Sequence, residues 1–497
     1  MNRTEITKEL KILIQSTHPL IGIETVEEEI VTHYLKALSE EMTIEFFEWS
    51  TVRGLEATKG TYATRNTDDP LVCSKFMRDF AGTAVFLLKD FTSHLQTPLH
   101  IRMFREACQS LSKRKSSAIM IGSGLQLPKE IQHRAVVLDW PLPDQDEVKQ
   151  LINKTFEKLN SVKPSVKFEI KKEDHLSLLN SLSGLTRAQV EDALTSSFVS
   201  EASLNANDLQ TLLDRKAKVL KSGVQLEYIP PHKITSDLGG FKNLKKWLDR
   251  TQIAFTPEAK KRGVPLPKGI LFVGVPGCGK SLAVRVIAAQ WKMPLLKLDP
   301  SLLLDKYIGE SEKNFRSAVK IAENMAPCIL WIDEIEKAME AQGGSSGDSG
   351  VGKRLFGAFL TWLQEKQSMV YVMATANNLD ILPPELLRKG RFDEIFFVDL
   401  PNDIERDTIL KLHFNRRTVD SSKIDFPKLV QATAKFSGAE LEHVVINLIL
   451  ENLSTQVPMT TDLAIQECKK IIPLAVARSE DIENLRTSAS MQFTKVS

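Results

Sequence analysis

The second half of the chain alternates short apolar runs with longer segments of helical hydrophobic spacing. The apolar runs have the length of buried strands and lie at 270–273, 295–298, 329–332, 370–373 and 395–398. This alternation predicts an α/β domain with a parallel sheet. Beyond Pro401 the pattern becomes helical only, with apolar faces at 408–414 and 441–450, which predicts a small helical lid.

The domain organisation follows from length and from these changes of pattern. A chain of 497 residues has room for about three domains, each with its own core. We expect a separate N-terminal α/β domain and a linker that contains the pair Pro230-Pro231. A large α/β subdomain and then the lid with a C-terminal tail follow. The expected boundaries are 1–220, 221–232, 233–400 and 401–497.

Charge and cysteine usage narrow the class of protein. Lys and Arg number 65 and Asp and Glu 63, so no global field marks a nucleic-acid or membrane-surface binder. The sequence has no basic stripe with interleaved aromatic residues, which argues against a nucleic-acid partner. The cysteines are scattered without a CxxC pair, and no apolar run reaches the length of a membrane span. These features predict a soluble protein with reduced thiols in a cytoplasmic compartment.

A glycine-rich loop directly follows the first apolar run of the second half. Its glycines let backbone amides turn inward around phosphate groups, and the next helix presents its positive N-terminus. Lys280 is expected to neutralise phosphate oxygens, and the Ser281 hydroxyl to ligate Mg²⁺. A chance match in a glycine-containing turn is the alternative. The predicted phosphate-binding residues are Gly274, Val275, Pro276, Gly277, Cys278, Gly279, Lys280, Ser281 and Leu282.

Polar residues follow the later strands at places suited to nucleotide hydrolysis. Asp333 and Glu334 end an apolar strand, so Asp333 is expected to hold Mg²⁺ and Glu334 to deprotonate the attacking water. Asn377 follows the next strand and is expected to position that water. Arg388 and Arg391 supply guanidinium groups from outside the loop. The alternatives are acids at a solvent edge, a turn asparagine and two surface arginines at a helix end.

The first half of the chain contains short segments that echo the second half. The pairs are 127–131 with 382–386, 138–141 with 398–401, and 183–185 with 437–439. In addition, residues 85–90 form an apolar run that ends in Asp. Either the first half is a duplicate, or two α/β domains share short strings by coincidence. A duplicate would have lost its phosphate grip, because the first half contains no GxxxxGK motif.

The region 236–450 resembles the AAA family of ATPases. The resemblance rests on Asp237-Leu238-Gly239-Gly240, the phosphate loop, Asp333-Glu334, Asn377, the segment 387–393 and Ser437-Gly438-Ala439-Glu440. It implies that Asp237 and Gly239 lie beside adenine, and that Gly438 and Ala439 border the nucleotide from the lid. It also implies that Arg388 and Arg391 reach a neighbour's ATP in a ring, usually a hexamer.

The same resemblance assigns a pore loop. Tyr307, Ile308 and Gly309 match the family's central loop, which grips an extended polypeptide, and a buried tyrosine in a loop is the alternative. Residues 343–352, rich in Gly and Ser, are either a second pore loop or a linker. One departure concerns Ala376, where the family commonly has Thr, so a hydroxyl is lost before Asn377.

More narrowly, the whole chain resembles the AAA proteins of cyanobacteria and plastids known as hypothetical chloroplast reading frame forty-six. The likeness rests on 386–400, on 471–475 with 481–486, and on the pairing with a degenerate first domain. It implies a Mg²⁺-dependent ATPase in the cyanobacterial cytosol or plastid stroma that remodels a protein partner, with a link to photosynthetic or inorganic-carbon regulation. The alternative function is a nucleotide-gated scaffold that threads no substrate.

Overall fold

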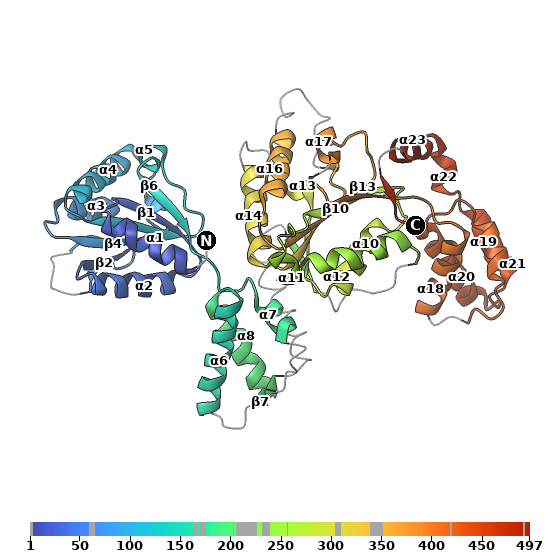
Figure 1. Cartoon of the computed structure of the whole chain (residues 1–497), viewed down its shortest axis with the longest axis horizontal. Coiled ribbons are helices and arrows are strands. Elements are labelled where there is room, and N and C mark those ends of the chain that lie inside the picture. Colours follow the sequence, from blue (N-terminus) through green and yellow to red (C-terminus); the bar gives the residue numbers. More distant parts are fainter. Residues whose placement is uncertain are drawn as a thin grey trace. The chain divides into compact units, whose positions relative to one another are not determined.

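The computed structural model describes most of the chain as two compact units. The described residues are 3–58, 65–162, 167–168, 175–201, 203–204, 226–230, 239–255, 257–303, 310–337, 351–388, 390–417, 420–490 and 493–497. The first unit comprises Met1–Val166 and Gly184–Val199, and the second comprises Lys167–Ser183 and Ser200–Ser497. Each unit has its own sheet (Figure 1).

The sheet of the second unit contains all five predicted apolar runs as neighbouring parallel strands. Among the described residues its order is β15-β14-β10-β13-β12-β11-β9, and β9 at the edge is antiparallel to β11. The strands are β9 (Leu226–Ile229), β10 (Gly269–Gly274), β11 (Leu295–Leu298), β12 (Cys328–Ile332), β13 (Val370–Ala376), β14 (Glu394–Val398) and β15 (Thr494–Lys495). The predicted parallel α/β architecture is therefore confirmed.

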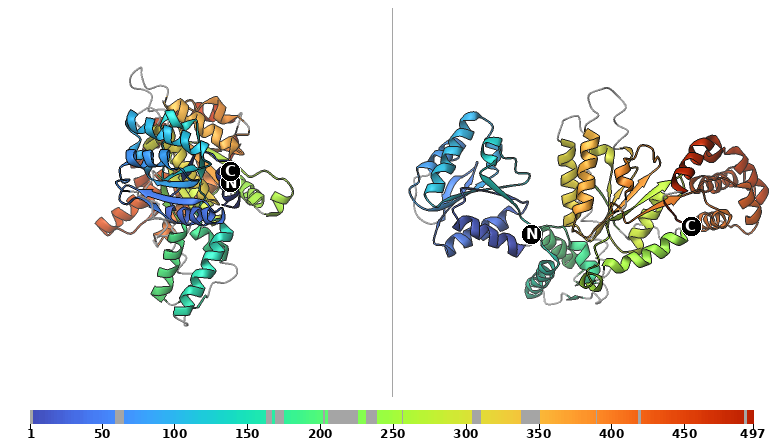
Figure 2. Two further views of the ribbon diagram at one scale, coloured as in Figure 1. Left: turned by 90° about the vertical axis from the view of Figure 1, so that its left-hand side faces the viewer. Right: turned by 45° about the horizontal axis from the view of Figure 1, so that its top comes forward.

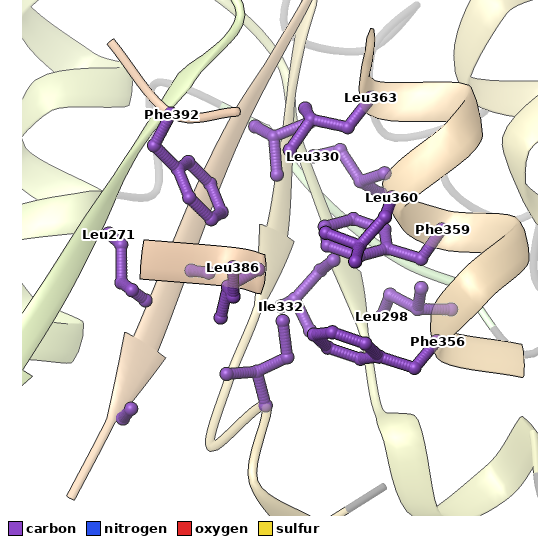
Figure 3. Close-up of a cluster of buried hydrophobic side chains, with 14 of the residues drawn as sticks. Leu271, Leu298, Leu330, Ile332, Phe356, Phe359, Leu360, Leu363, Leu386 and Phe392 are labelled. Atoms are coloured by element: carbon purple, nitrogen blue, oxygen red, sulfur yellow. The ribbon is translucent and has the colours of Figure 1, made fainter. Parts of the chain in front are cut away.

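Helices cover both faces of this sheet because its central strands are apolar on both sides. Leu271 of β10 packs against the face covered by α14 and α16, whereas Phe272 packs against the face covered by α10 and α12. In Figure 3, Phe356 and Phe359 of α16 extend toward the strand residues Leu330 and Ile332. The helices of this part are α10 (Lys242–Gln252), η3 (Ile253–Phe255), α11 (Pro257–Lys261), α12 (Lys280–Gln290), α13 (Pro300–Leu303), α14 (Glu310–Asn324), α16 (Val351–Glu365) and α17 (Pro384–Leu387).

The lid is a cluster of helices at one end of the second unit (Figures 1 and 2). Capping boxes start two of its helices, at Asn402 with Glu405 and at Ser437 with Glu440, and satisfy backbone amides that a helix leaves unpaired. Phe414 and Leu441 lie in its buried core. The helices here are α18 (Asp403–Arg416), α19 (Phe426–Ala432), α20 (Gly438–Thr455), α21 (Thr461–Lys470), α22 (Leu474–Ala477) and α23 (Ser479–Ser490). After α23 the chain returns to the sheet as β15, which pairs with β14.

The first unit repeats the strand order of the second. Its sheet runs β3-β2-β4-β5-β1-β6, so β2-β4-β5-β1-β6 correspond to β11-β12-β13-β10-β14, and all of these neighbours are parallel. Its edge strand β3 is antiparallel to β2, as β9 is to β11. The strands are β1 (Leu20–Glu24), β2 (Glu45–Ser50), β3 (Gly54–Ala57), β4 (Ala84–Lys89), β5 (Ser117–Gly122) and β6 (Ala135–Asp139). This shared order confirms a degenerate, ATPase-like first domain.

Helices of the first unit occupy the matching positions between strands. α2 follows β1 as α12 follows β10, and α5 precedes β6 as α17 precedes β14. The helices are α1 (Arg3–Gln15), α2 (Glu28–Glu41), α3 (Pro70–Asp79), η1 (Phe91–His94), α4 (Pro98–Lys113), α5 (Lys129–Gln132), α6 (Gln145–Val162) and α8 (Arg187–Glu201). Between these last two helices the chain forms α7 (His175–Leu182) and β7 (Lys167–Phe168), and β7 pairs with β8 (Ser203–Leu204).

Three structural features of the described residues bear on the expectations from composition. None of their helices combines the length and the hydropathy that crossing a membrane requires. All five cysteines are buried, and their thiols are not joined in disulfides. The described part of the chain also contains no group of three or more His, Cys, Asp or Glu side chains arranged to hold a metal ion.

Candidate active site

A pocket of about 440 Å³ lies where the ends of β10, β12 and β13 meet the lid. Ligands of open parallel sheets bind at this carboxyl end of the strands. Most of the predicted phosphate-binding residues line the pocket, together with residues of the lid. The lining residues are Gly239, Phe241, Pro276, Gly277, Cys278, Gly279, Lys280, Ser281, Leu282, Asp333, Glu334, Thr375, Asn377, Ile409, Leu412, His413, Arg416, Gly438, Ala439 and Glu442.

The glycines of the loop are required by close backbone approaches. A Cβ atom on Gly274 would lie 2.0 Å from the carbonyl oxygen of Val398, so no larger residue fits there. Gly277 has a φ of +74°, in the left-handed region that favours glycine. Its carbonyl oxygen accepts a hydrogen bond of 3.0 Å from the Ala439 amide at the start of α20. The loop is thereby tied to the lid.

Lys280 lies inside the curve of this loop. Its ammonium group donates to the carbonyl oxygens of Gly274 at 2.8 Å and Val275 at 2.9 Å. Burial lowers the pKa of Lys280 to about 8, although Cys278 and the nearby carboxylates act in the opposite direction. A buried cation at the N-terminus of a helix is a suitable partner for phosphate oxygens.

Oxygen ligands suited to Mg²⁺ come together beside this lysine. The Ser281 hydroxyl donates to Asp333 Oδ1 at 3.1 Å, and the Thr375 hydroxyl donates to the same oxygen at 2.7 Å. Lys297 Nζ lies 3.6 Å from Asp333 Oδ2. One carboxylate and a hydroxyl, completed by waters and phosphate oxygens, form a donor set that Mg²⁺ prefers. The residues present therefore fit the ion that the sequence predicts.

The candidate base is held by two neighbours. The Asn377 side-chain amide donates to Glu334 Oε1 at 3.0 Å, and the Lys337 ammonium forms an ion pair with Glu334 Oε2. Glu334 itself has a φ of +51°. Its amide donates to the Thr375 hydroxyl at 2.9 Å, which fixes the backbone in this uncommon conformation.

Thr375 and Glu336 are site residues that the sequence reasoning did not single out. Ala376 lacks the hydroxyl that the family commonly has at this position. Thr375, one residue earlier, supplies a hydroxyl instead, which donates a hydrogen bond to Asp333. Glu336 is 4% exposed, and its Oε1 accepts a hydrogen bond of 2.8 Å from the backbone amide of Asn377. Burial raises the pKa of Glu336 above its usual range. In the sequence, Glu336 could have been found only as a second acid two residues beyond Glu334.

The lid contributes side chains that no sequence motif marked. Ile409, Leu412 and His413 of α18 line the pocket together with Glu442 of α20. His413 Nδ1 lies 3.7 Å from Glu442 Oε1, and burial lowers the pKa of His413. In the sequence these residues look like any others of an amphipathic helix. Only the packing of the lid against the phosphate loop shows that they line the pocket.

The two arginines lie away from this pocket. Arg388 is exposed just after α17, and Arg391 donates from Nη1 to the carbonyl oxygen of Leu360 at 2.9 Å. Neither residue lines the pocket of its own chain. Asp237 falls outside the described residues, and so do Tyr307, Ile308 and Gly309, which the sequence predicts to form a pore loop. Most of the segment 343–352 also falls outside them.

The strand order, the glycine loop with its lysine, and the acidic end of β12 define a P-loop protein of the ATPase class. The family "ATPase family associated with various cellular activities (AAA)" matches residues 270–400. The N-terminal and second domains of SpoVK-like AAA ATPases match 6–140 and 146–223. The chain belongs to the AAA ATPase family.

Relatives narrow this placement further. The chain is 36% identical to the AAA domain-containing protein ycf46 of Trieres chinensis over 97% of this chain and 96% of that protein. It is 35% identical to the protein of the same name from Pyropia yezoensis, over 97% of each. A more distant relative, the ATPase family protein 2 homolog of Caenorhabditis elegans, is 31% identical over 67% of this chain and 44% of that protein. The expected grouping with the reading-frame-forty-six proteins is confirmed.

Proposed function

We propose that this protein hydrolyses ATP with Mg²⁺ in the pocket between β10, β12, β13 and the lid. One observation carries the proposal: Ser281, Asp333 and Thr375 share one hydrogen-bonded cluster, with Glu334 and Asn377 bonded to each other beside it. A metal-binding hydroxyl and carboxylate next to a positioned base are the parts that phosphoryl transfer to water requires.

Each residue has a distinct part in this reaction. Lys280 binds the β- and γ-phosphates once it leaves the carbonyl oxygens of the loop, and Ser281 and Asp333 hold Mg²⁺, which supplies positive charge to the phosphates when bound. Glu334 accepts the proton of the attacking water. Asn377 positions that water relative to Glu334. Because Lys337 pairs with one oxygen of Glu334, that oxygen becomes a free proton acceptor only when the ion pair opens.

The base assignment is tested by Glu334→Gln, with phosphate release as the measurement. The amide has nearly the same shape but cannot accept the proton, so we expect the rate to fall by about 10²-fold or more while ATP remains bound. Glu365→Gln, on the exposed end of α16, is the matched control and should keep the wild-type rate. Rapid hydrolysis by Glu334→Gln would refute the assigned base.

We further propose that the active assembly is a hexameric ring in which Arg388 and Arg391 complete the site of the adjacent subunit. Support comes from the family and from their placement, since both lie outside the pocket of their own chain. In this arrangement Arg391 exchanges the Leu360 carbonyl for a phosphate oxygen of the neighbour. A guanidinium supplied in trans is a recurring way to link hydrolysis to assembly.

The ring would remodel a protein partner through the loop at Tyr307, Ile308 and Gly309, in the cytosol or stroma, with a regulatory link to photosynthesis or inorganic carbon. The proposed domain boundaries remain 1–220, 221–232, 233–400 and 401–497. Tyr307→Ala separates threading from the scaffold function. A remodelling protein should lose partner-stimulated turnover in this variant, whereas a nucleotide-gated scaffold should keep both partner binding and turnover.

A further inference from the structure

In the first unit, two positions that correspond to active-site residues of the second unit carry side chains of the opposite charge. α2 begins at Glu28, where the matching helix α12 begins at Lys280. Leu88 of β4 pairs with the residue two positions before the end of β5. Ile332 of β12 likewise pairs with the residue two positions before the end of β13, so Leu88 and Ile332 are equivalent in register. The next residues along the chain, Lys89 and Asp333, therefore hold equivalent positions. A lysine–aspartate site in the second unit thus corresponds to a glutamate–lysine pair in the first.

These exchanged charges neutralise each other inside the first unit. Lys89 Nζ lies 2.8 Å from Glu28 Oε1 and 2.6 Å from Glu48 Oε1. The connection from β1 to α2, residues 25–27, is also shorter than the connection from β10 to α12, residues 275–279. It lacks both the length and the lysine with which the second unit encloses phosphate.

Glu27, at the end of this short connection, is bound by α8. Among the described residues α8 is the third helix after β6, as α20 is the third helix after β14, so the two helices hold corresponding places. The backbone amide of Arg187, the first residue of α8, donates to Glu27 Oε1 at 2.6 Å, and the Arg187 guanidinium donates to Glu27 Oε2. The two side chains are 3% and 8% exposed. In the second unit the matching helix start binds the phosphate loop through the Ala439 amide and the Gly277 carbonyl.

The same arginine joins α6 to this contact. Arg187 Nη2 donates to Glu147 Oε2 at 2.6 Å, and Arg3 Nη1 donates to Glu147 Oε1 at 2.5 Å. Burial acts to raise the pKa of Glu147, but these hydrogen bonds outweigh it, and the pKa lies below its usual value. Here an arginine and an amide at a helix start both donate hydrogen bonds to one buried carboxylate. Proteins use the same two elements to bind phosphate.

We propose that the Glu27 carboxylate permanently occupies the position of a phosphate group in the first unit, so that this unit binds no nucleotide and keeps α6 and α8 closed on its sheet throughout the ATP cycle. This inference goes beyond the proposed hydrolysis, which concerns the second unit alone. The first unit then serves as a fixed body, and nucleotide-driven movement is confined to the second unit.

The stoichiometry of Mg-ADP binding to the full chain tests the first part. Isothermal titration should give one ADP per wild-type chain and none for Lys280→Ala. Two ADP per wild-type chain, or one that remains in Lys280→Ala, would overturn the inference. Absence of binding to both chains would contradict the proposed function but agree with an empty first unit, so the two failures are distinct.

Hydrogen exchange tests the closed helices. In Glu27→Gln the amides at the start of α8 should exchange at least tenfold faster, whereas Glu56→Gln should leave them unchanged, because its pair with Arg53 is long, at 3.8 Å, and exposed. Unchanged exchange in a folded Glu27→Gln would overturn the clamp. Should that variant fail to fold, the wild-type protein still decides: α8 must exchange at the same rate with and without Mg-ADP, and nucleotide-dependent protection there would overturn the inference.

Discussion

The backbone amide of Ala439 donates to the carbonyl oxygen of Gly277 at 3.0 Å, so the first turn of lid helix α20 is bonded directly to the phosphate loop. A Cβ atom on Gly438 would lie 3.3 Å from the same carbonyl oxygen, which shows how closely the two backbones approach. We therefore expect a change in the loop, as phosphates bind or leave, to reach the lid through this hydrogen bond. The proposed hydrolysis thus takes place next to the lid, and we expect the chemistry in the pocket and the lid to be coupled.

Gly277→Ala should weaken nucleotide binding and loosen the lid. The residue has a φ of +74°, and its new Cβ would lie 3.1 Å from Ser437 Oγ and 3.2 Å from Ala439 Cβ. Left-handed backbone costs an L-residue about 1 to 2 kcal/mol, so the ADP dissociation constant should rise roughly tenfold. Gly357→Ala is the control, since a Cβ there meets nothing within 4 Å, and alanine should stabilise helix α16 by about 1 kcal/mol. Equal ADP affinity in both variants would contradict the lid contact.

Thr375→Val should impair the metal site while leaving the fold intact. Valine removes the hydroxyl that donates to Asp333 and leaves the Glu334 amide without its acceptor. A lost buried hydrogen bond costs about 1 to 3 kcal/mol, so we expect about a tenfold fall in kcat and a higher Mg²⁺ requirement, measured by phosphate release against Mg²⁺ concentration. Thr375→Ser keeps the hydroxyl and should restore most of the activity. An active Val variant would show that the Thr375 hydroxyl is dispensable.

Much of the fold could be predicted because its strands are apolar on both faces. The runs ending at Val273, Ile332 and Val398 became strands of the central sheet, since burial on both sides leaves a continuous hydrophobic pattern in the sequence. β15 could not be found this way, because Thr494 and Lys495 are exposed and become a strand only by pairing with β14. Strand edges of this kind are determined by tertiary pairing instead of local composition.

The candidate site divides in the same manner. The phosphate loop and Asp333-Glu334 carry their chemistry in adjacent residues, so their spacing alone predicts the site. His413 and Thr375 have no such marker. The partnership of Glu27 and Arg187 joins residues 160 positions apart, and neither residue type at its position indicates the other. The echo between the two halves pointed to a duplicated domain, but only the paired strands revealed that its charges had been exchanged.

The pH dependence of the protein's stability should reveal the lowered pKa of Lys366. Burial lowers the pKa of Lys366 to about 8, and its ammonium group donates to the Val370 carbonyl at 2.6 Å. Between pH 8 and the ordinary lysine value near 10.5, the unfolded chain therefore binds more protons than the folded one, and stability from this group rises with pH. The stability of wild type relative to Lys366→Met should increase from pH 7.5 to 10, as measured by denaturant unfolding. A constant difference would contradict the buried, depressed lysine.

Mixing two inactive variants tests whether sites are shared between subunits. We expect Lys280→Ala to lose phosphate binding and Arg388→Ala to leave a neighbour's site incomplete, so each should hydrolyse ATP at least about tenfold more slowly than wild type. In mixed assemblies some intact pockets face an intact arginine, and phosphate release should recover to an intermediate level. A mixture as inactive as its components would place Arg388 outside the shared site.

The mass of Glu334→Gln with and without Mg-ATP, measured by light scattering after size exclusion, shows whether the subunits assemble into a ring. This variant should retain ATP and hold the assembly in one state. We expect a shift to roughly six subunits on addition of Mg-ATP, as a closed ring with one nucleotide site at each subunit boundary requires. A monomer or dimer under both conditions would leave Arg388 and Arg391 with no adjacent site to complete and would contradict the ring.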